Sequence, residues 1–324
     1  MNECKKEKKG RDLNVVYCDN WLNNNLPDKC ANLLICDPPY YKVKGEFDFI
    51  WKTFDDYLAD VEKWAIECKR VLADNGTLFW YGSAKNIAYA QIIFDKHFTL
   101  INNLVWNKGS FMGLEESEGL RSFAPCTERI LMYGIESKND NLGYFYEGDR
   151  FALNYIKDEC RKIGITTRKQ YDVLLNATNK SQHHLSESHF RLIKEDDYNL
   201  LKLKSNGKAF LMSYNDFLSR HNSYQRAFNN IFNLQEVLNF SNEQAKTGAK
   251  YDHDTVKPEQ LTRALILTCS RKGDLVVMPF AGSGTECAMS AKEGRNFIGF
   301  DIEQKHVDTS NKRCQWILRQ PQLF

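Results

Sequence analysis

Short apolar segments alternate with longer helical patterns from Leu13 to about Gly134, and this alternation restricts the fold more than any other feature. Over Phe54–Leu72, apolar residues recur at spacings of three and four, as in an amphipathic helix, and Asp74-Asn75-Gly76 predicts a turn after it. Strands that alternate with helices predict βα units on a mostly parallel sheet. The candidate strands are Leu13–Tyr17, Asn32–Cys36, Thr77–Tyr81, Leu100–Trp106 and Arg129–Gly134.

The same α/β character returns in the last part of the chain after a middle region of a different kind. Residues 139–250 are polar and predominantly helical in pattern, with 16 Lys and Arg against 12 Asp and Glu over 141–250. After residue 251 come a helical pattern at Pro258–Cys269, a strand at Leu275–Met278, a helix at about Glu286–Glu293 and a strand at Asn296–Asp301. We therefore predict three regions, 1–138, 139–250 and 251–324, of which the first and third have α/β character.

Asp37-Pro38-Pro39-Tyr40 directly follows the apolar strand that ends at Cys36. Paired prolines cannot extend a central strand, so the chain leaves the sheet at its carboxyl end, where open α/β sheets bind ligands. Asp37 and the Pro38 carbonyl each offer an acceptor for an exocyclic amino group, and Tyr40 offers a ring to stack on a planar base. An ordinary strand-ending turn is the alternative interpretation.

A glycine turn follows the strand Leu275–Met278 and precedes a helix. Its residues are Phe280, Ala281, Gly282, Ser283, Gly284 and Thr285. Glycines permit close backbone approach, and the amide groups at a helix start favour a negatively charged ligand. Asp301 ends the next strand, 19 positions after Gly282, near the spacing of about 20 at which an acidic side chain meets ribose hydroxyls. This context favours a nucleoside-binding half over a plain tight turn.

The two motifs in this order resemble the amino-group DNA methyltransferases that use S-adenosylmethionine. D-P-P-Y comes first and F-A-G-S-G-T last, which is similar to the permuted β class of that family. Further segments fit the resemblance: Asp19 after the first strand, Thr127–Leu131 before the middle region, and Lys257 within His253–Pro258. The chain departs from the family at Met278-Pro279-Phe280, where the family usually has Asp-Pro-Phe, which puts capture of the cofactor's amino-acid end in question.

The resemblance implies a fold, a cofactor and a reaction. The fold class is α/β, a Rossmann-like S-adenosylmethionine-dependent methyltransferase sheet with circularly permuted motif order and a mostly helical inserted target-recognition domain. The catalytic residues would be Asp37, Pro38, Pro39 and Tyr40, and the cofactor-binding residues Asp19, Lys257, the glycine turn 280–285 and Asp301.

The expected reaction is N6-methylation of adenine in duplex DNA, with the base flipped out of the helix. Asp at the first motif position favours adenine over the N4-amino group of cytosine, which stays the alternative. RNA and protein-glutamine methyltransferases usually carry the glycine turn before the proline pair, so the motif order argues against them. A catalytically weak DNA-binding module is the alternative from another class.

The basic stretch of the middle region is the candidate DNA-contacting surface. A helix over Phe151–Ile163, a break at Gly164, a helix through about Leu175 and a third over Ser181–Leu192 are similar to a helix-turn-helix arrangement. Lysines and arginines bind phosphates, whereas amides and histidines read base edges. The candidate residues are Lys169, Asn179, Lys180, Gln182, His183 and His184. A solvated polar helical domain is the alternative, and we expect no metal at these histidines, since neighbouring cysteine or acidic ligands are missing.

Composition restricts the setting more than the function. A net charge of +2 names no partner, and no apolar stretch has the roughly 20 residues of a membrane span. The first residues lack the apolar segment of a secretory signal, and the ten cysteines form no C-x-x-C pair, so we expect a cytoplasmic protein. The expected partner is double-stranded DNA, with a cognate restriction endonuclease and a second copy of the chain as further candidates and no membrane.

Overall fold

The computed structural model describes residues 11–43, 46–109, 121–123, 125–135, 147–149, 151–241 and 256–319. The chain divides into two compact units. One, the sheet unit, joins Met1–Glu136 to Ala227–Phe324, and the other, the helical unit, is Ser137–Arg226. Both predicted region boundaries, 138/139 and 250/251, fall on residues outside the described ones. Among the described residues no helix is long and apolar enough to cross a membrane.

The sheet unit is built on eight strands in the order β1-β8-β7-β2-β3-β5-β4-β6. The strands from β1 to β3 in this order are mutually parallel, whereas β5 runs antiparallel to both of its neighbours, β3 and β4. The prediction of a mostly parallel sheet is therefore confirmed. The bounds are β1 Val15–Cys18, β2 Ala31–Cys36, β3 Leu72–Ser83, β4 Thr99–Asn107, β5 Thr127–Gly134, β6 Val237–Asn239, β7 Leu275–Met278 and β8 Asn296–Asp301.

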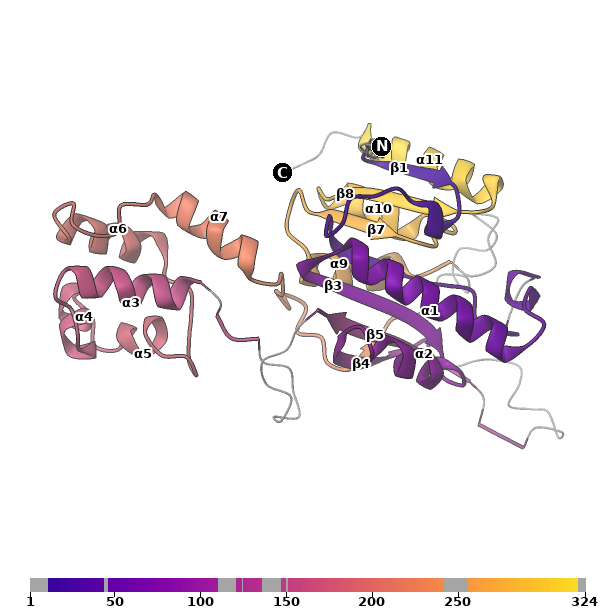
Figure 1. The fold of residues 1–324 in the computed structure, drawn as a ribbon, viewed down its shortest axis with the longest axis horizontal. Helices are drawn as coiled ribbons and strands as arrows, with labels where there is room; N and C mark the ends of the chain where they lie inside the picture. Colours follow the sequence, from indigo (N-terminus) through magenta and orange to yellow (C-terminus); the bar gives the residue numbers. More distant parts are fainter. Residues whose placement is uncertain are drawn as a thin grey trace, which may run out of the picture. The chain divides into compact units, whose positions relative to one another are not determined.

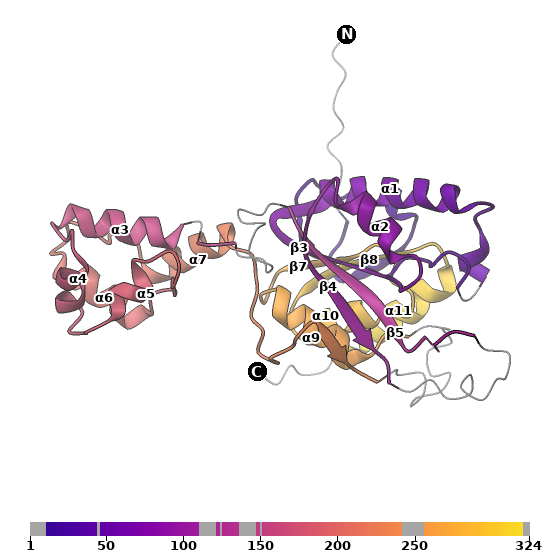
Figure 2. The same ribbon diagram turned by 90° about the horizontal axis from the view of Figure 1, so that it is seen from below.

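Helices cover both faces of this sheet, as Figures 1 and 2 show. On one face lie α1 (Phe54–Val71) and α2 (Ile87–Phe94), and on the other α9 (Glu259–Cys269), α10 (Thr285–Lys292) and α11 (Gln304–Leu318). The two short 3-10 helices are η1 (Trp21–Asn23) and η2 (Glu46–Phe49). Each layer of helices encloses its own buried apolar cluster against the sheet. The alternating pattern predicts the βα units of this three-layer arrangement, which is the Rossmann-like architecture that the family resemblance implies.

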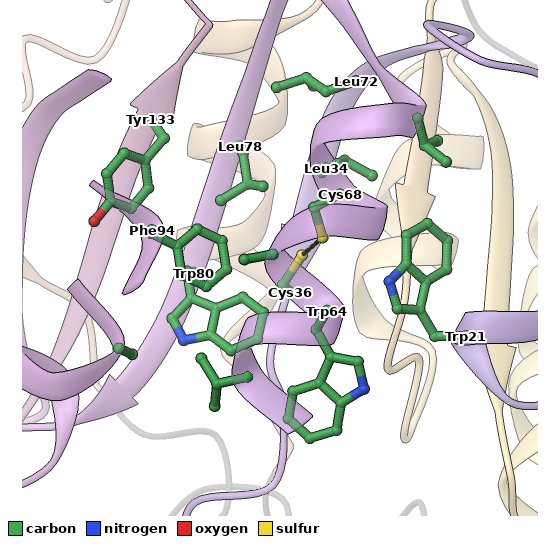
Figure 3. Close-up of a cluster of buried hydrophobic side chains, with 14 of the residues drawn as sticks. Trp21, Leu34, Cys36, Trp64, Cys68, Leu72, Leu78, Trp80, Phe94 and Tyr133 are labelled. Atoms are coloured by element: carbon green, nitrogen blue, oxygen red, sulfur yellow. Dashed lines mark hydrogen bonds between the residues drawn. The ribbon is translucent and has the colours of Figure 1, made fainter. Parts of the chain in front are cut away.

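The cluster under α1 contains a group of aromatic rings that Figure 3 shows. Trp51, Trp64 and Trp80 are all buried, with at most 8% of each residue exposed. The Trp80 ring lies 4.5 Å from that of Phe94, and Trp64 meets the Phe280 ring edge-on at 5.0 Å between centroids. Because Phe280 begins the glycine turn, this packing fixes the turn against the N-terminal half of the sheet unit.

Helix α1 starts at a capping box. The Thr53 hydroxyl accepts a hydrogen bond from the Asp56 amide at 3.1 Å, and the Asp56 carboxylate accepts one from the Thr53 amide at 3.0 Å. The apolar residues Tyr57, Val61 and Trp64 then face the sheet, as their spacing predicts.

We expect Thr53→Ala to lower the free energy of unfolding by about 1 kcal/mol, because one amide of the first turn loses its acceptor. Urea denaturation measures the change. Thr53→Ser keeps the hydroxyl and should leave the stability within about 0.5 kcal/mol of the original; an equal loss in both variants would show that the cap does not matter.

The prediction of a turn at Asp74-Asn75-Gly76 is wrong, because the structure has an irregular part of a strand there. These residues lie inside β3, where the pairing with β2 shifts: Ala31 pairs with Leu72, but Leu33 pairs with Thr77. Two steps along β2 thus correspond to five along β3, so the turn-forming residues make a bulge rather than a reversal. Turn-forming residues fit such a bulge because it leaves backbone outside the regular ladder.

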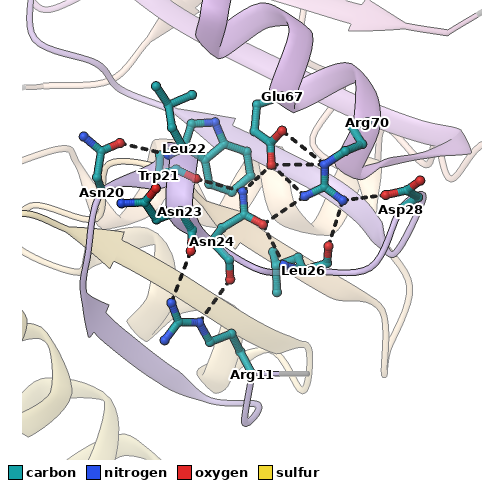
Figure 4. A network of polar contacts seen from close by, with 10 residues as sticks. All are labelled: Arg11, Asn20, Trp21, Leu22, Asn23, Asn24, Leu26, Asp28, Glu67 and Arg70. Carbon is teal, nitrogen blue, oxygen red and sulfur yellow. Dashed lines mark hydrogen bonds and ion pairs between the residues drawn. The ribbon is translucent and has the colours of Figure 1, made fainter. Parts of the chain in front are cut away.

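A polar network holds the segment between β1 and β2 (Figure 4). The Arg70 guanidinium on α1 contacts the carboxylates of Glu67 and Asp28 at 2.6 Å each and the Asn24 side-chain oxygen at 3.1 Å. Arg11 donates to the Asn24 carbonyl at 3.0 Å and contacts the Asp19 carboxylate at 2.5 Å. The network therefore fixes the chain directly after β1, where Asp19 lies.

The helical unit has its own core. It contains α3 Ala152–Lys162, α4 Arg168–Leu174, α5 Lys180–His184, α6 Glu195–Lys204 and α7 Tyr214–Tyr224. Tyr171, Tyr198, Phe210 and Phe217 are almost fully buried within it.

Two features of the middle region differ from the sequence-based prediction. The helix expected over Ser181–Leu192 ends at His184, and β6 places residues 237–239 in the sheet beside β4, although they precede the predicted boundary at 250. Serines after His184 bond locally, Ser188 to the His189 ring at 2.8 Å, and such bonds compete with a continuing helix.

Candidate functional site

The residues that follow the parallel strands lie along one edge of the sheet. β1, β8, β7, β2 and β3 are parallel, so the residues that follow them lie on the same side: Asp19, Asp301, the glycine turn, Asp37 and the loop after Ser83. Because β5 is antiparallel, its first residues lie at this edge too, with the last residues of β4 beside them. D-P-P-Y and the glycine turn thus leave adjacent strands, β2 and β7.

Asp37 is fixed by two side chains from its surroundings. The Lys257 ammonium lies 2.7 Å from Asp37 Oδ2, and the Tyr40 hydroxyl donates to Asp37 Oδ1 at 2.7 Å. The Tyr40 amide in turn donates to Asp48 at 2.5 Å. The side chain of Lys257 is only 6% exposed, and its ammonium also lies 5.6 Å from the centre of the Tyr40 ring. Of the predicted site residues, Asp37, Tyr40 and Lys257 therefore meet directly.

Glu128 and Lys108 complete this cluster, and sequence reasoning did not name them as site residues. Lys108 follows β4 and Glu128 lies at the start of β5. Glu128 contacts Lys108 at 3.1 Å and Lys257 at 3.5 Å, and it accepts a long hydrogen bond from the Tyr40 hydroxyl at 3.4 Å. The sequence does show a charged residue directly after β4 and another at the start of β5. These two residues point to a shared site only once the antiparallel pairing of β4 and β5 is known.

The two carboxylates of this cluster, Asp37 and Glu128, form ion pairs with the ammonium groups of Lys257 and Lys108. Burial alone would raise the pKa of Glu128, but Lys257 and Lys108 lower it. Burial would lower the pKa of Lys257, but Asp37 and Glu128 raise it above its usual value. Lys257 therefore stays protonated and holds the two carboxylates, which is an orienting role and excludes Lys257 as a general base at neutral pH.

The glycine turn has the backbone that glycine permits. Gly282 and Gly284 have φ of 49° and 72°, and a Cβ on Gly284 would lie 2.6 Å from the Cβ of Ser310 on α11. The Gly282 amide donates to Asp301 Oδ2 at 2.9 Å, and the Ser310 hydroxyl donates to the Gly282 carbonyl at 2.9 Å. Asp301 thus orients the turn from the end of β8.

The remaining predicted cofactor residues line the turn and the neighbouring strand ends. The Thr285 hydroxyl accepts from Arg313 at 3.0 Å and lies 3.3 Å from that of Ser283. Ala281 is buried and donates its amide to the Phe300 carbonyl at 2.7 Å. The Asp19 amide donates to the Asp301 carbonyl at 3.0 Å, so the two acidic residues are neighbours.

Glu286 is a further carboxyl group of this region, and the sequence did not indicate it as a site residue. It lies in the first turn of α10, is 7% exposed, and burial and Asp37 raise its pKa to about 7, whereas Lys257 and Arg313 act in the opposite direction. Tyr81 on β3 lies close enough for Glu286 to raise the pKa of its phenol, after burial as the main cause.

Glu286 should make stability depend on pH. Its folded pKa of about 7 exceeds the ordinary 4.5, so its contribution is greatest below pH 4.5 and is lost as the pH rises to about 7. We compare the free energy of unfolding of Glu286→Gln with that of the unchanged protein. As the pH rises from 5 to 7, we expect this difference to move in favour of the variant by on the order of 1–3 kcal/mol. Urea denaturation at a series of pH values measures this, and a constant difference would contradict it.

The candidate DNA-contacting residues lie on α4, α5 and the turn between them. Lys169 and Asn179 are exposed, and Gln182 and His183 are half-buried. Lys180 is paired with Asp197 at 2.5 Å. His184 is buried, with its Nδ1 2.9 Å from the Tyr171 hydroxyl, and burial lowers its pKa. The prediction that His184 reads a base edge is corrected, because its ring belongs to the core of the helical unit.

No group of three or more His, Cys, Asp or Glu that could hold a metal ion occurs within the described part of the chain. Asp37, Glu128 and Asp19 are instead paired with Lys257, Lys108 and Arg11, and Asp301 lies 3.4 Å from the His306 ring.

Comparison with known proteins identifies the family. The chain is 26% identical over 293 residues to the DNA adenine methyltransferase YhdJ of Escherichia coli K12, covering 89% of this chain and 77% of that protein. It is 26% identical over 308 residues to the type II methyltransferase M1.MboII of Moraxella bovis, covering 92% and 94%. The solved PvuII DNA methyltransferase, which is cytosine-N4-specific, has a TM-score of 0.53 at 13% identity, covering 94% and 90%, and so shares the fold. A family model described as DNA methylase matches residues 31–312, and the chain therefore belongs to this family of N6 and N4 amino-methyltransferases.

Proposed function

We propose that the protein transfers a methyl group from S-adenosylmethionine to the N6 amino group of adenine in duplex DNA, as a permuted, β-class enzyme of the D-P-P-Y type. The observation that carries this is the pair of adjacent strands, β2 and β7, from which Asp37 and the glycine turn emerge side by side. The chain order, Asp37 first and Gly282 last, supports the permuted assignment.

The residues at the strand ends fit the cofactor. S-Adenosylmethionine supplies an activated methyl electrophile, so no covalent nucleophile of the protein is needed. The turn 280–285 presents backbone at the N-terminus of α10, where amide groups favour a carboxylate, and Asp301 and Asp19 lie at the ends of β8 and β1. From the sequence, Lys257 was expected to bind the cofactor. Its ammonium instead contacts the carboxylates of Asp37 and Glu128, so we propose that Lys257 orients Asp37.

Asp37 and the Pro38 carbonyl activate the amino group. Its nitrogen lone pair is delocalised into the ring, and hydrogen bonds from both amino hydrogens to these acceptors favour a pyramidal, more nucleophilic nitrogen. Each oxygen of a carboxylate can accept two hydrogen bonds, so Asp37 can accept from the amino group while it keeps its contact with Lys257. As the new N–C bond forms, the bond between the methyl carbon and sulfur breaks, the cofactor is left as the neutral thioether, and one amino proton leaves along its hydrogen bond to Asp37.

Tyr40 and the helical unit would contact the DNA, Tyr40 by stacking on the target base and the helical unit by recognising the target sequence. A base reaches Asp37 only after it leaves the duplex, at a cost of a few kcal/mol, and stacking on the Tyr40 ring offsets part of this cost. We assign target recognition to the helical unit, where Lys169 and Asn179 are exposed. We also infer a cognate endonuclease and a homodimer as partners, and the cytoplasm as the site of a DNA-modifying reaction.

The decisive experiment identifies the product. The purified protein is incubated with duplex DNA of mixed sequence and S-adenosylmethionine, and the nucleosides are analysed by mass spectrometry. We expect N6-methyl-2′-deoxyadenosine. N4-methyl-2′-deoxycytidine would favour the alternative suggested by the fold shared with the PvuII enzyme.

A catalytically weak DNA-binding module is the second alternative, and Met278 in place of an acidic residue motivates it. Titration with S-adenosylmethionine separates the two: the module would bind DNA but show no saturable cofactor binding.

A further inference from the structure

Glu286 has a carboxylate oxygen without a hydrogen-bond partner. Oε1 is buried and no described residue bonds to it. Buried polar side chains nearly always have such a partner, because an unsatisfied group carries its full desolvation cost. The group lies two positions after Gly284, at the start of the eight-residue helix α10. An unsatisfied carboxyl group at this place indicates a ligand that brings its own donor.

A second buried polar group, on β3, is also unsatisfied. The Tyr81 hydroxyl is also buried and has no partner among the described residues, and Glu286 acts on its pKa. Tyr81 is on β3, and Lys257 lies 5.1 Å from the centre of its ring. Glu286 Oε1 and the Tyr81 hydroxyl are therefore two buried polar groups, on α10 and β3, that no described residue satisfies.

The other carboxylates at the carboxyl ends of the parallel strands already have hydrogen-bond or ion-pair partners within the protein. Asp37 contacts Lys257 and Tyr40, Asp301 accepts from the amides of Gly282 and Glu303, and Asp19 contacts Arg11. At the end of β7 the chain has Met278, which carries no charge. Glu286 is thus the acidic group near the glycine turn that retains an unsatisfied oxygen among the described residues.

We propose that Glu286 binds the ammonium group at the amino-acid end of the S-adenosyl cofactor and supplies the charge that Met278 does not. This inference rests on the proposed function. An ammonium has three N–H donors to satisfy Oε1, whereas the sulfonium has none. The N-terminus of α10 favours the carboxylate of the same amino-acid end, which places the ammonium within reach of the first turn of this helix.

The test compares two ligands and two proteins by calorimetric titration. The ligands are S-adenosylhomocysteine and its analogue without the amino group, and the proteins are the unchanged chain and Glu286→Gln. We expect Glu286→Gln to weaken S-adenosylhomocysteine binding by about 10-fold or more, the size expected of a hydrogen bond between charged groups. The analogue should bind both proteins equally.

A rescue variant completes the design. Met278→Asp in the Glu286→Gln protein returns a carboxylate to the end of β7 and should recover most of the lost affinity for S-adenosylhomocysteine but not change that for the analogue. Equal weakening of both ligands by Glu286→Gln, or no weakening, would overturn the assignment. If the unchanged chain binds neither ligand, the proposed function itself fails, which separates the two outcomes.

Discussion

Replacing Asp37 by alanine should reduce the rate of methyl transfer by at least about 1,000-fold, because the amino group loses the acceptor that makes its nitrogen nucleophilic. Binding of S-adenosylmethionine should change little, since Asp37 lies at the end of β2 and the glycine turn is held separately by Asp301 and Ser310. The fold should also survive. Lys257 retains Glu128 as a partner, so no buried charge is left alone.

Incorporation of labelled methyl groups into DNA measures the rate, and calorimetric titration measures cofactor affinity. Asp55→Asn is the matched control, because Asp55 is an exposed carboxylate of the sheet unit in the first turn of α1. It should keep nearly full activity. Turnover by Asp37→Ala within a few-fold of the unchanged enzyme would remove Asp37 from the reaction.

The strands were predictable because their signals are local. Apolar runs such as Leu33–Cys36 and the helical spacing of Tyr57, Val61 and Trp64 depend only on neighbours in the sequence, and the elements appear within a few residues of the expected bounds. The motif residues Asp37 and Gly282 could be located for the same reason, since Asp37 directly follows β2 and Gly282 lies four positions after the end of β7.

The partners of Asp37 could not be found in this way. Lys257 and Glu128 are far apart in the chain and meet only because β5 runs antiparallel to β3, which brings Glu128 opposite Ser83 at the carboxyl edge. Glu286 carries no local signal either, since a glutamate in a first helical turn is ordinary on an exposed surface. Its burial follows from the layers packed around α10.

The helical unit shows the same limit on a smaller scale. A basic, polar stretch predicts solvent exposure, yet His184 is buried against Tyr171. The ring is amphipathic, and only tertiary packing decides which of two adjacent histidines, His183 or His184, faces inward. Charge pattern therefore located a candidate surface but did not separate surface residues from core residues within it.

Lys257→Met should destabilise the protein by about 3–5 kcal/mol, because removing one partner leaves uncompensated charge in a buried cluster. The Lys257 side chain is 6% exposed and lies between Asp37 and Glu128, whose side chains are 21% and 18% exposed. Methionine has a similar length, so lost charge rather than lost volume should dominate. Urea denaturation at pH 8 measures the change.

The control and the pH dependence decide whether charge is the cause. Lys29→Met removes an ammonium from an exposed pair with Asp74 and should cost less than about 1 kcal/mol. Lys257 lowers the pKa of Glu128 in the folded protein, so the stability from Glu128 is present above pH 4.5 and is lost as the pH falls through its folded pKa. Without Lys257, the burial of Glu128 raises its pKa, so Glu128 of the variant takes up a proton more readily as the pH falls, and the difference between Lys257→Met and the unchanged protein should shrink from pH 8 to pH 4. A difference that stays constant over this range would assign the loss to packing and leave Lys257 without the electrostatic role that its contacts indicate.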